Sequence, residues 1–308
     1  MEASTISPTD RSNTGFVDVF EYGTHGRPAW ADIDWRPNLK QIELEGRRLN
    51  FLQLGDPGSP TVILIHGLSG AWQNWLENVQ ALASEFHVIA PDLPGFGESE
   101  LPLEPVSIHG YARTIIALMD ALGIEKASLV GNSMGGQTAA QVALDEPHRV
   151  EKLILVSPVG YSTSTAPSAI TRGAAPLALI MSRVGARSES IAKRPGLRKA
   201  FLMSVAAHPE KLRPEIVYEL IGGTGKVGFV AAVQAIFAHD LREQLGGITA
   251  PTLIIWGQKD RLITSRDAHR FADKIAGSIK LIVRDTGHLT MVERPDWFNE
   301  TARDFILS

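Results

Sequence analysis

The chain has 308 residues, of which 44% are hydrophobic and 21% are charged, a balance typical of a globular protein with a sizeable core. Its formal net charge of -4 argues against nucleic acid as a partner, because phosphate binding relies on a basic surface. The chain contains no cysteine, which excludes disulfides, thiolate catalysis and cysteine-ligated zinc. No stretch approaches the roughly 20 apolar residues that a membrane-spanning helix needs, so we expect no integral membrane segment.

Residues 1–36 are predicted to form an N-terminal arm or a poorly ordered leader. The first part of this arm, residues 1–15, is polar and lacks the apolar core of a signal peptide, which favours a cytoplasmic protein. Aromatic side chains follow, among them Phe16, Tyr22 and Trp30. They indicate that the second part of the arm packs on the body of the protein.

Short apolar runs rich in Val and Ile predict buried strands along the rest of the chain. These runs are residues 61–66, 86–91, 126–131, 152–157, 252–257 and 279–284. Both alternating faces of each run are apolar, as in strands covered on both sides, and most runs are separated by helical patterns. Residues 41–55 differ, because two alternating runs predict an antiparallel hairpin that opens the sheet. We therefore expect an α/β fold with a mostly parallel eight-stranded sheet and helices on both faces.

The alternation of strands and helices stops once, between residues 160 and 245. This segment has helical periodicity and no convincing strand, so we expect a helical cap inserted after the sixth predicted strand. The body is then formed by residues 37–159 and 246–308. Residues 183–199 of the cap are rich in Lys and Arg. They form either a solvated face or a surface that attracts an anionic substrate or lipid.

Small residues crowd around a serine where the strand at residues 126–131 ends, in the sequence GNSMG of residues 131–135. Ser133 is interpreted either as a helix cap or as a nucleophile on a tight strand-to-helix turn. Side chains at the flanking glycines would collide in such a turn. The amide of Met134 would then lie at a helix N-terminus, where developing negative charge is favoured.

Three other strand ends supply partners for a serine nucleophile. The backbone amide of Leu68, after the first long strand, is a candidate second oxyanion donor. Asp260 and His288 follow the last two predicted strands, which would bring both to one edge of the sheet. Each has a plain alternative as a turn residue or an ordinary histidine, but the order serine, aspartate, histidine is that of one known triad architecture.

These motifs together resemble the α/β-hydrolase superfamily over residues 41–308. The segments LIHGLSG, PDLPGFGES, GNSMGG, WGQKD and TGH stand in the order expected for that family. The resemblance implies the α/β-hydrolase fold, with its cap between the sixth and seventh strands, and an acyl-enzyme mechanism. Ser133 would be the nucleophile, His288 the base and Asp260 its orienting acid, with the oxyanion bound by Leu68 and Met134.

The substrate is less clearly specified than the fold. A serine nucleophile argues against relatives such as haloalkane dehalogenases and epoxide hydrolases, which resemble this chain but use aspartate. Carbon–carbon hydrolases of ring-cleavage products are an alternative, although they usually have a glycine-rich oxyanion loop with proline, and tryptophan where this chain has Leu289. A slow-turnover ligand-binding protein with an intact triad is a second alternative.

We expect a carboxylic ester hydrolase for small to medium apolar acyl groups, with a small-molecule ester as its partner. The pocket would lie between the cap and the sheet. Four residues are expected to line it from the sheet side: His66, Gly67, Trp72 and Trp75. Neither the histidines nor the carboxylates have metal-ligand spacing, so no metal and no cofactor are predicted.

Overall fold

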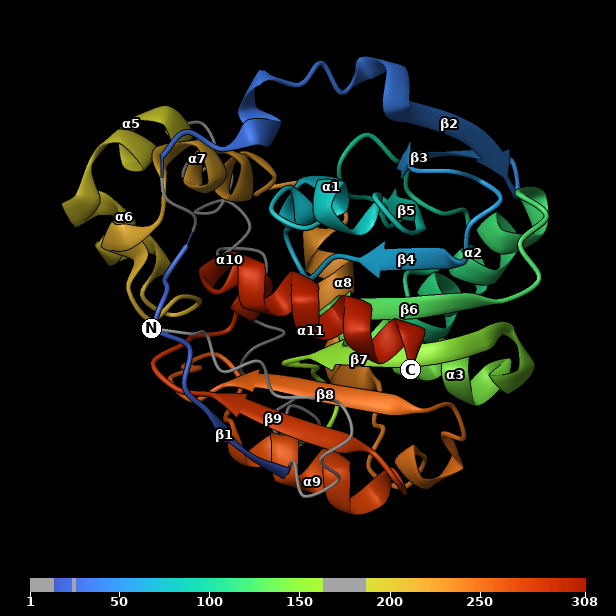
Figure 1. The fold of residues 1–308 in the computed structure, drawn as a ribbon. Coiled ribbons are helices and arrows are strands. Elements are labelled where there is room, and N and C mark those ends of the chain that lie inside the picture. The colour runs from blue at the N-terminus through green and yellow to red at the C-terminus, as the bar shows by residue number, and fades with distance from the viewer. Residues whose placement is uncertain (1–13, 24–25, 163–186) are drawn as a thin grey trace.

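The computed structural model of the protein describes residues 14–23, 26–162 and 187–308. These residues form a nine-stranded sheet with helices on both faces (Figure 1). In sheet order the strands are β1 (Thr14–Val17), β9 (Ile279–Val283), β8 (Thr252–Gly257), β7 (Val150–Val156), β6 (Ala127–Asn132), β4 (Thr61–Ile65), β5 (His87–Pro91), β3 (Arg47–Leu54) and β2 (Leu39–Leu44). Only β2 with β3 and β3 with β5 pair antiparallel. The predicted hairpin followed by a parallel sheet is therefore confirmed.

The predicted number of strands, eight, is wrong by one. The additional strand is β1, which belongs to the N-terminal arm and pairs in parallel with β9, so that Gly15 lies opposite Leu281. Its sequence, TGFV, is too short to show an alternating pattern. Its partner also lies near the other end of the chain, so no local signal marks it as a strand.

Helices cover the two faces of the sheet because each strand sends alternate side chains to opposite sides. Ile63 and Ile65 of β4 pack in one core with α2 (Ile108–Ala121), α3 (Met134–Asp145) and α9 (Arg266–Lys274). Val62 and Leu64 pack in the other core with α1 (Val79–Leu82), α10 (Thr290–Glu293) and α11 (Pro295–Leu307). Short 3-10 helices occur at Ala29–Asp32, Arg36–Asn38, Trp72–Trp75, Pro147–Arg149, Pro209–Lys211 and Leu245–Gly247. None of the helices in the described part of the chain is long and apolar enough to cross a membrane.

Among the described residues, four α-helices lie between β7 and β8, where the sequence predicts the cap. They are α5 (Ser188–Lys193), α6 (Pro195–Leu202), α7 (Pro214–Gly222) and α8 (Phe229–Ala238). Figure 1 shows α5, α6 and α7 grouped on the side to which the arrowheads of β4, β8 and β9 point. These helices are thus near the carboxyl ends of the parallel strands, where open α/β sheets bind their ligands. Residues 163–186 of the predicted cap lie outside the described residues.

Candidate active site

Ser133 occupies a strained turn between β6 and α3. Its backbone has φ 58° and ψ -117°, a conformation that a non-glycine residue rarely adopts. The neighbouring glycines make this turn sterically possible. A Cβ on Gly131 would lie 2.2 Å from the carbonyl oxygen of Gly135, and a Cβ on Gly135 would lie 2.1 Å from that of Ile65.

The hydroxyl of Ser133 does not cap α3, so the interpretation of this serine as a helix cap is wrong. The backbone of Ser133 is instead fixed on both sides. Its N–H donates to the carbonyl of Val156 at 3.0 Å, and its own carbonyl accepts from the N–H of Gln137 at 3.0 Å. The turn therefore holds the serine rigidly while leaving its hydroxyl available for chemistry.

The structure brings Asp260 and His288 together at the carboxyl ends of β8 and β9. His288 Nδ1 lies 2.7 Å from Asp260 Oδ2, and both residues are buried. The other carboxylate oxygen, Oδ1, accepts hydrogen bonds from the backbone N–H groups of Leu262 and Ile263, each at 2.9 Å. Because all these donors converge on one carboxylate, the imidazole is held in a defined orientation.

Asn132, which the sequence analysis did not single out, connects the turn at Ser133 to the loop that contains His288. This loop, residues 284–289 between β9 and α10, is called the histidine loop below. Its side-chain Nδ2 donates to the backbone carbonyl of His288 at 3.3 Å and to that of Val156 at 3.1 Å. No hydrogen bond joins the side chains of Ser133 and His288 themselves among the described residues. Catalytic hydrogen bonds are often long before substrate binds, so this geometry is compatible with proton transfer.

The loop after β4 lies directly against Ser133. A Cβ on Gly67 would be 3.2 Å from the Cβ of Ser133, which places this loop beside the serine turn. His66 fixes the loop, since its Nε2 accepts from the N–H of Leu93 at 2.9 Å and its Nδ1 therefore donates to the carbonyl of Gly67 at 2.7 Å. Burial lowers the pKa of the His66 imidazole, which favours this neutral form.

Three of the residues expected to line a pocket, His66, Trp72 and Trp75, are buried in the structure. His66 is fully buried and uses both ring nitrogens to hold the loop. Trp75 is also fully buried and packs on Phe298 of α11, with ring centroids 6.3 Å apart. Trp72 packs on Trp35 of the N-terminal arm at 5.5 Å. Trp72 and Trp75 belong to the hydrophobic core on one face of the sheet, and their place in a substrate pocket stays a prediction.

Asp92, in the segment PDLPGFGES, organises the neighbouring loops. Its carboxylate accepts from the N–H of Trp72 and from Asn50 Nδ2, each at 2.8 Å, and from the N–H of Glu98 at 2.9 Å. A Cβ on Gly97 would overlap this carboxylate, at 2.0 Å from Oδ2. The segment is thus a structural clamp beside the loop that contains Gly67.

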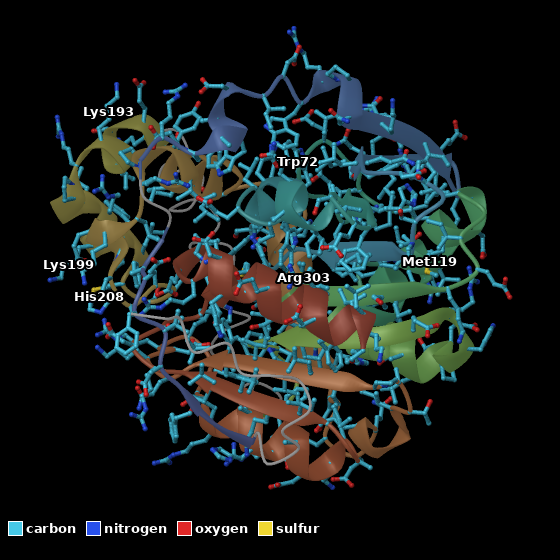
Figure 2. All side chains as sticks on the ribbon, in the orientation of Figure 1. Trp72, Met119, Lys193, Lys199, His208 and Arg303 are labelled. Carbon is cyan, nitrogen blue, oxygen red and sulfur yellow. The ribbon has the colours of Figure 1, made fainter. Side chains whose placement is uncertain are left out.

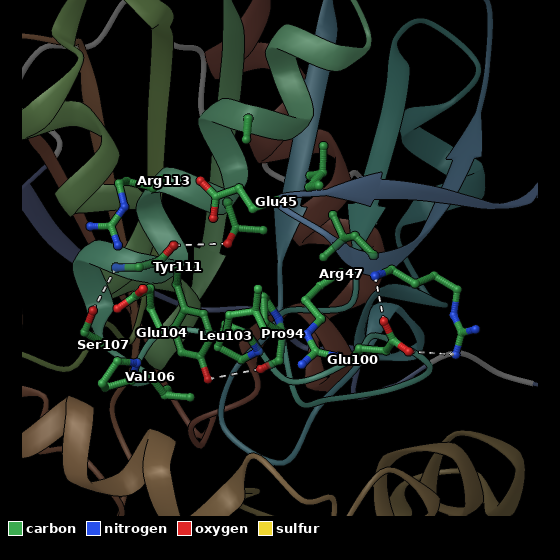
Figure 3. Close-up of a pocket in the computed structure, with 18 residues that line it drawn as sticks. Glu45, Arg47, Pro94, Glu100, Leu103, Glu104, Val106, Ser107, Tyr111 and Arg113 are labelled. Atoms are coloured by element: carbon green, nitrogen blue, oxygen red, sulfur yellow. Dashed lines mark hydrogen bonds and ion pairs between the residues drawn. The ribbon is translucent and has the colours of Figure 1, made fainter.

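A cavity of about 410 Å³ lies away from Ser133, between the β2–β3 hairpin and α2. Figure 3 shows Arg47 from the hairpin and Tyr111 and Arg113 from α2 around it, and none of Ser133, Asp260 and His288 lines it. The expected apolar pocket between cap and sheet involves residues 163–186, which are outside the described residues. No group of three His, Asp or Glu residues in the described part of the chain could hold a metal ion.

The basic segment of the cap divides into outward and inward cations. Figure 2 shows Lys193 and Lys199 projecting outward from α5 and α6. Arg198 is buried instead, and its guanidinium donates to the backbone carbonyls of Ala192 at 2.5 Å and Glu210 at 2.9 Å. One of the cations that the sequence analysis grouped together therefore stabilises the cap.

Comparisons with known proteins place this geometry in a family. A family model of the alpha/beta hydrolase fold matches residues 60–178. The chain is 32% identical to the dihydrolipoyllysine-residue acetyltransferase component of the acetoin cleaving system of Cupriavidus necator, over 96% of this chain and 76% of that protein. It is 31% identical to the 2-hydroxy-6-oxononadienedioate/2-hydroxy-6-oxononatrienedioate hydrolase of Klebsiella pneumoniae, over 84% of this chain and 91% of that protein.

A solved structure agrees with these relatives. The enol-lactonase of Burkholderia xenovorans superposes with a TM-score of 0.72 and 27% identity, over 87% of this chain and all of that chain. The fold, its mostly parallel sheet and the serine turn define a hydrolase of the α/β class. The chain belongs to the α/β-hydrolase family.

Proposed function

We propose that the protein hydrolyses carboxylic esters with small to medium apolar acyl groups through an acyl-enzyme on Ser133. The observation that carries the proposal is the strained turn at Ser133, which Asn132 connects to the histidine loop. On that loop His288 Nδ1 lies 2.7 Å from Oδ2 of Asp260, which follows the neighbouring strand. A rigid serine and an oriented imidazole are the two parts that nucleophilic acyl transfer requires.

Each residue has one role in the proposed reaction. Ser133 Oγ attacks the ester carbonyl while His288 Nε2 takes its proton, and Asp260 stabilises the resulting imidazolium. The tetrahedral oxyanion accepts hydrogen bonds from the backbone N–H groups of Met134, at the start of α3, and Leu68. His288 then returns the proton to the leaving alcohol. A water molecule, deprotonated by His288, hydrolyses the acyl-enzyme and releases the carboxylic acid.

Two kinds of bond are candidates for cleavage by Ser133. An enol-lactonase, which is 27% identical in sequence, resembles this chain in structure, and its name describes cleavage of a cyclic ester. A second candidate, hydrolysis of a carbon–carbon bond in a ring-cleavage product, is favoured by the 31% identity to the dienedioate hydrolase. The leucine at position 289, where carbon–carbon hydrolases usually have tryptophan, favours the ester substrate.

The two candidates are separated by comparing p-nitrophenyl esters of graded acyl length with a ring-cleavage dienone. We expect kcat/KM to be highest for short to medium acyl esters and to be lost in Ser133→Ala, together with labelling by a fluorophosphonate. Ser84→Ala, which removes an exposed serine hydroxyl bonded only to the carbonyl of Ala81, is the matched control and should keep full activity.

Three outcomes contradict the proposal, each in a different way. Faster turnover of the dienone than of any ester would assign the protein to carbon–carbon hydrolysis. Labelling of Ser133 without turnover of any substrate would indicate a slow ligand-binding protein of hydrolase fold. Labelling that persists in Ser133→Ala would place the nucleophile elsewhere.

A further inference from the structure

A buried carboxylate outside the triad lies directly behind the histidine loop. Glu293, the last residue of α10, is fully buried, and burial raises the pKa of its carboxyl. A buried carboxylate is costly unless its oxygens accept hydrogen bonds. Here the donors come from three separate parts of the chain: the N–H of Gly287 at 3.0 Å, the N–H of Ala207 at 2.9 Å and the hydroxyl of Tyr22 at 2.6 Å.

Tyr22 brings the N-terminal arm into this cluster. Besides donating to Glu293, its hydroxyl accepts from the N–H of His208 at 2.9 Å. Its ring lies under the guanidinium of Arg294, 4.7 Å from the ring centroid, and edge-on to the imidazole of His208 at 5.4 Å. The adjoining N–H of Gly23 donates to the backbone carbonyl of Glu293 at 2.8 Å. The arm is therefore fastened at this point by main-chain and side-chain contacts together.

The same cluster holds the backbone of the catalytic histidine. The N–H of His288 donates to the carbonyl of Val205 in the cap at 2.9 Å, while the preceding N–H, of Gly287, is held by Glu293. A Cβ on Gly287 would lie 2.7 Å from the backbone nitrogen of Ala207, so the loop and the cap segment are in direct contact. The position of His288 thus depends on groups that Glu293 ties together.

Arg294 closes the cluster from the other side. Its Nε donates to Thr286 Oγ1 at 3.0 Å and its Nη2 to the carbonyl of Asp285 at 2.9 Å, both on the histidine loop. Its Nη1 donates to the carbonyl of Glu21 in the arm. Figure 1 shows the arm running from β1 at one edge of the sheet towards α7 and on to β2 at the other edge. The arm is consequently a strap across the carboxyl ends of the strands.

We propose that Tyr22 is a positioning residue for His288 and acts through Glu293, which makes the N-terminal arm part of the hydrolytic machinery. The role rests on the proposed function of His288 as the general base. Removing the Tyr22 hydroxyl deprives the carboxylate of its shortest hydrogen bond and leaves the N–H of His208 without its acceptor. The carboxylate of Glu293 then shifts, and the backbone of Gly287, whose N–H it binds, shifts as well. Gly287 directly precedes His288, so the imidazole moves too. The rate of proton transfer from Ser133 to His288 therefore falls, whereas the affinity for substrate stays the same.

The test compares Tyr22→Phe with Tyr111→Phe. Tyr111 lies in α2 and is buried, whereas Tyr22 is partly buried. The hydroxyl of Tyr111 donates to the backbone carbonyl of Pro94 at 3.4 Å and not to the cluster around Glu293. Both variants lose one hydrogen-bonded hydroxyl and keep the ring. We expect Tyr22→Phe to lower kcat and the rate of fluorophosphonate labelling by about tenfold, the effect of losing one hydrogen bond to a charged group. The KM should stay within about twofold, and Tyr111→Phe should leave all three quantities unchanged.

A second variant shows whether the effect passes through Glu293. Glu293→Gln keeps the shape of the side chain but replaces one acceptor oxygen by a donor, and we expect it to reduce kcat and labelling at least as much. In the Glu293→Gln background, the further change Tyr22→Phe should then have less than its full effect, because the two residues act as one unit. Fully multiplicative losses would overturn the coupling.

The outcomes distinguish this role from the proposed function. If the wild type hydrolyses esters but Tyr22→Phe matches wild type, or loses no more than Tyr111→Phe, Tyr22 is not a positioning residue. If the wild type prefers the dienone, the labelling rate still reports activation of Ser133 by His288 and tests Tyr22 independently of the substrate. A wild type that is neither active nor labelled overturns both proposals.

Discussion

Replacing Asp260 with asparagine should remove most of the activity because of the way its two oxygens are used. Oδ1 accepts from two backbone N–H groups, those of Leu262 and Ile263, whereas Oδ2 accepts from His288. An asparagine must keep its oxygen towards the two backbone donors, since an NH2 group there would face both of them. Its NH2 group therefore faces His288 Nδ1, which must become an acceptor. The ring proton moves to Nε2, the nitrogen that has to receive the serine proton.

We expect kcat for a p-nitrophenyl ester to fall by about 10⁴, equivalent to about 5.5 kcal/mol in activation free energy. The fold should persist, because the substitution preserves the shape of the side chain and keeps all three hydrogen bonds, the one to His288 with its direction reversed. Asp267→Asn is the control, since Asp267 is a buried carboxylate in the following helix that bonds to Ser162 and Arg270. A kcat for Asp260→Asn within tenfold of wild type, with circular dichroism unchanged, would refute the assignment of Asp260 as the orienting acid.

Three further predictions concern other parts of the molecule. Gly135→Ala should abolish labelling of Ser133 or prevent folding, since its Cβ would lie 2.1 Å from the carbonyl oxygen of Ile65; Gly196→Ala, with no atom within 4 Å, should leave labelling unchanged. Burial alone would raise the pKa of Asp285, but hydrogen bonds from Lys259 and His208 outweigh it and lower that pKa to about 2. Asp285→Asn should therefore lower the free energy of unfolding at pH 7, by less than about 1 kcal/mol because Asp285 and Lys259 are both half exposed. In urea titrations, the difference in the free energy of unfolding from wild type should vanish as the pH falls through the folded-state pKa of Asp285. A difference that is the same at every pH would contradict this prediction. If Lys199 attracts anionic substrates, Lys199→Gln should lower kcat/KM at low salt for a carboxylate-bearing ester but not for a neutral one; equal salt dependence of the two esters would show a merely solvated face.

The parts of the site that the sequence predicts are those with a local steric cause. The turn at Ser133 needs glycines at positions 131 and 135 because backbone carbonyls occupy the space of a side chain there. The pairing of Asp260 with His288 follows from topology, since consecutive parallel strands end at the same edge of the sheet. Both signals can be recognised in a short window of sequence together with the order of the strands.

The surroundings of Trp72, Trp75 and His66 depend instead on contacts with distant parts of the chain. The nearness of Trp72 and Trp75 to the oxyanion loop in sequence suggested a role in the pocket. Their burial is decided instead by Trp35 and Phe298, which come from opposite ends of the chain. Similarly, the sequence does not show that the N–H of Leu93 donates to His66, a contact that only the folded chain brings about. Hydrophobic pattern identifies a large apolar side chain as buried, but it does not distinguish core from pocket wall.

The N-terminal arm illustrates why such long-range contacts matter for function. A loop that holds a catalytic imidazole cannot be stabilised by its own short sequence, because its backbone donors need acceptors supplied from elsewhere. Here Glu293 supplies an acceptor to Gly287, and Tyr22, separated from Glu293 by almost the whole chain, supplies the carboxylate with its shortest hydrogen bond. The arm also pairs with β9, the strand that leads into the histidine loop, and accepts a hydrogen bond from Arg294, which follows α10, so it contacts the chain before and after that loop. Substitutions in the arm should therefore affect kcat through His288 even though no residue of the arm belongs to the proposed triad.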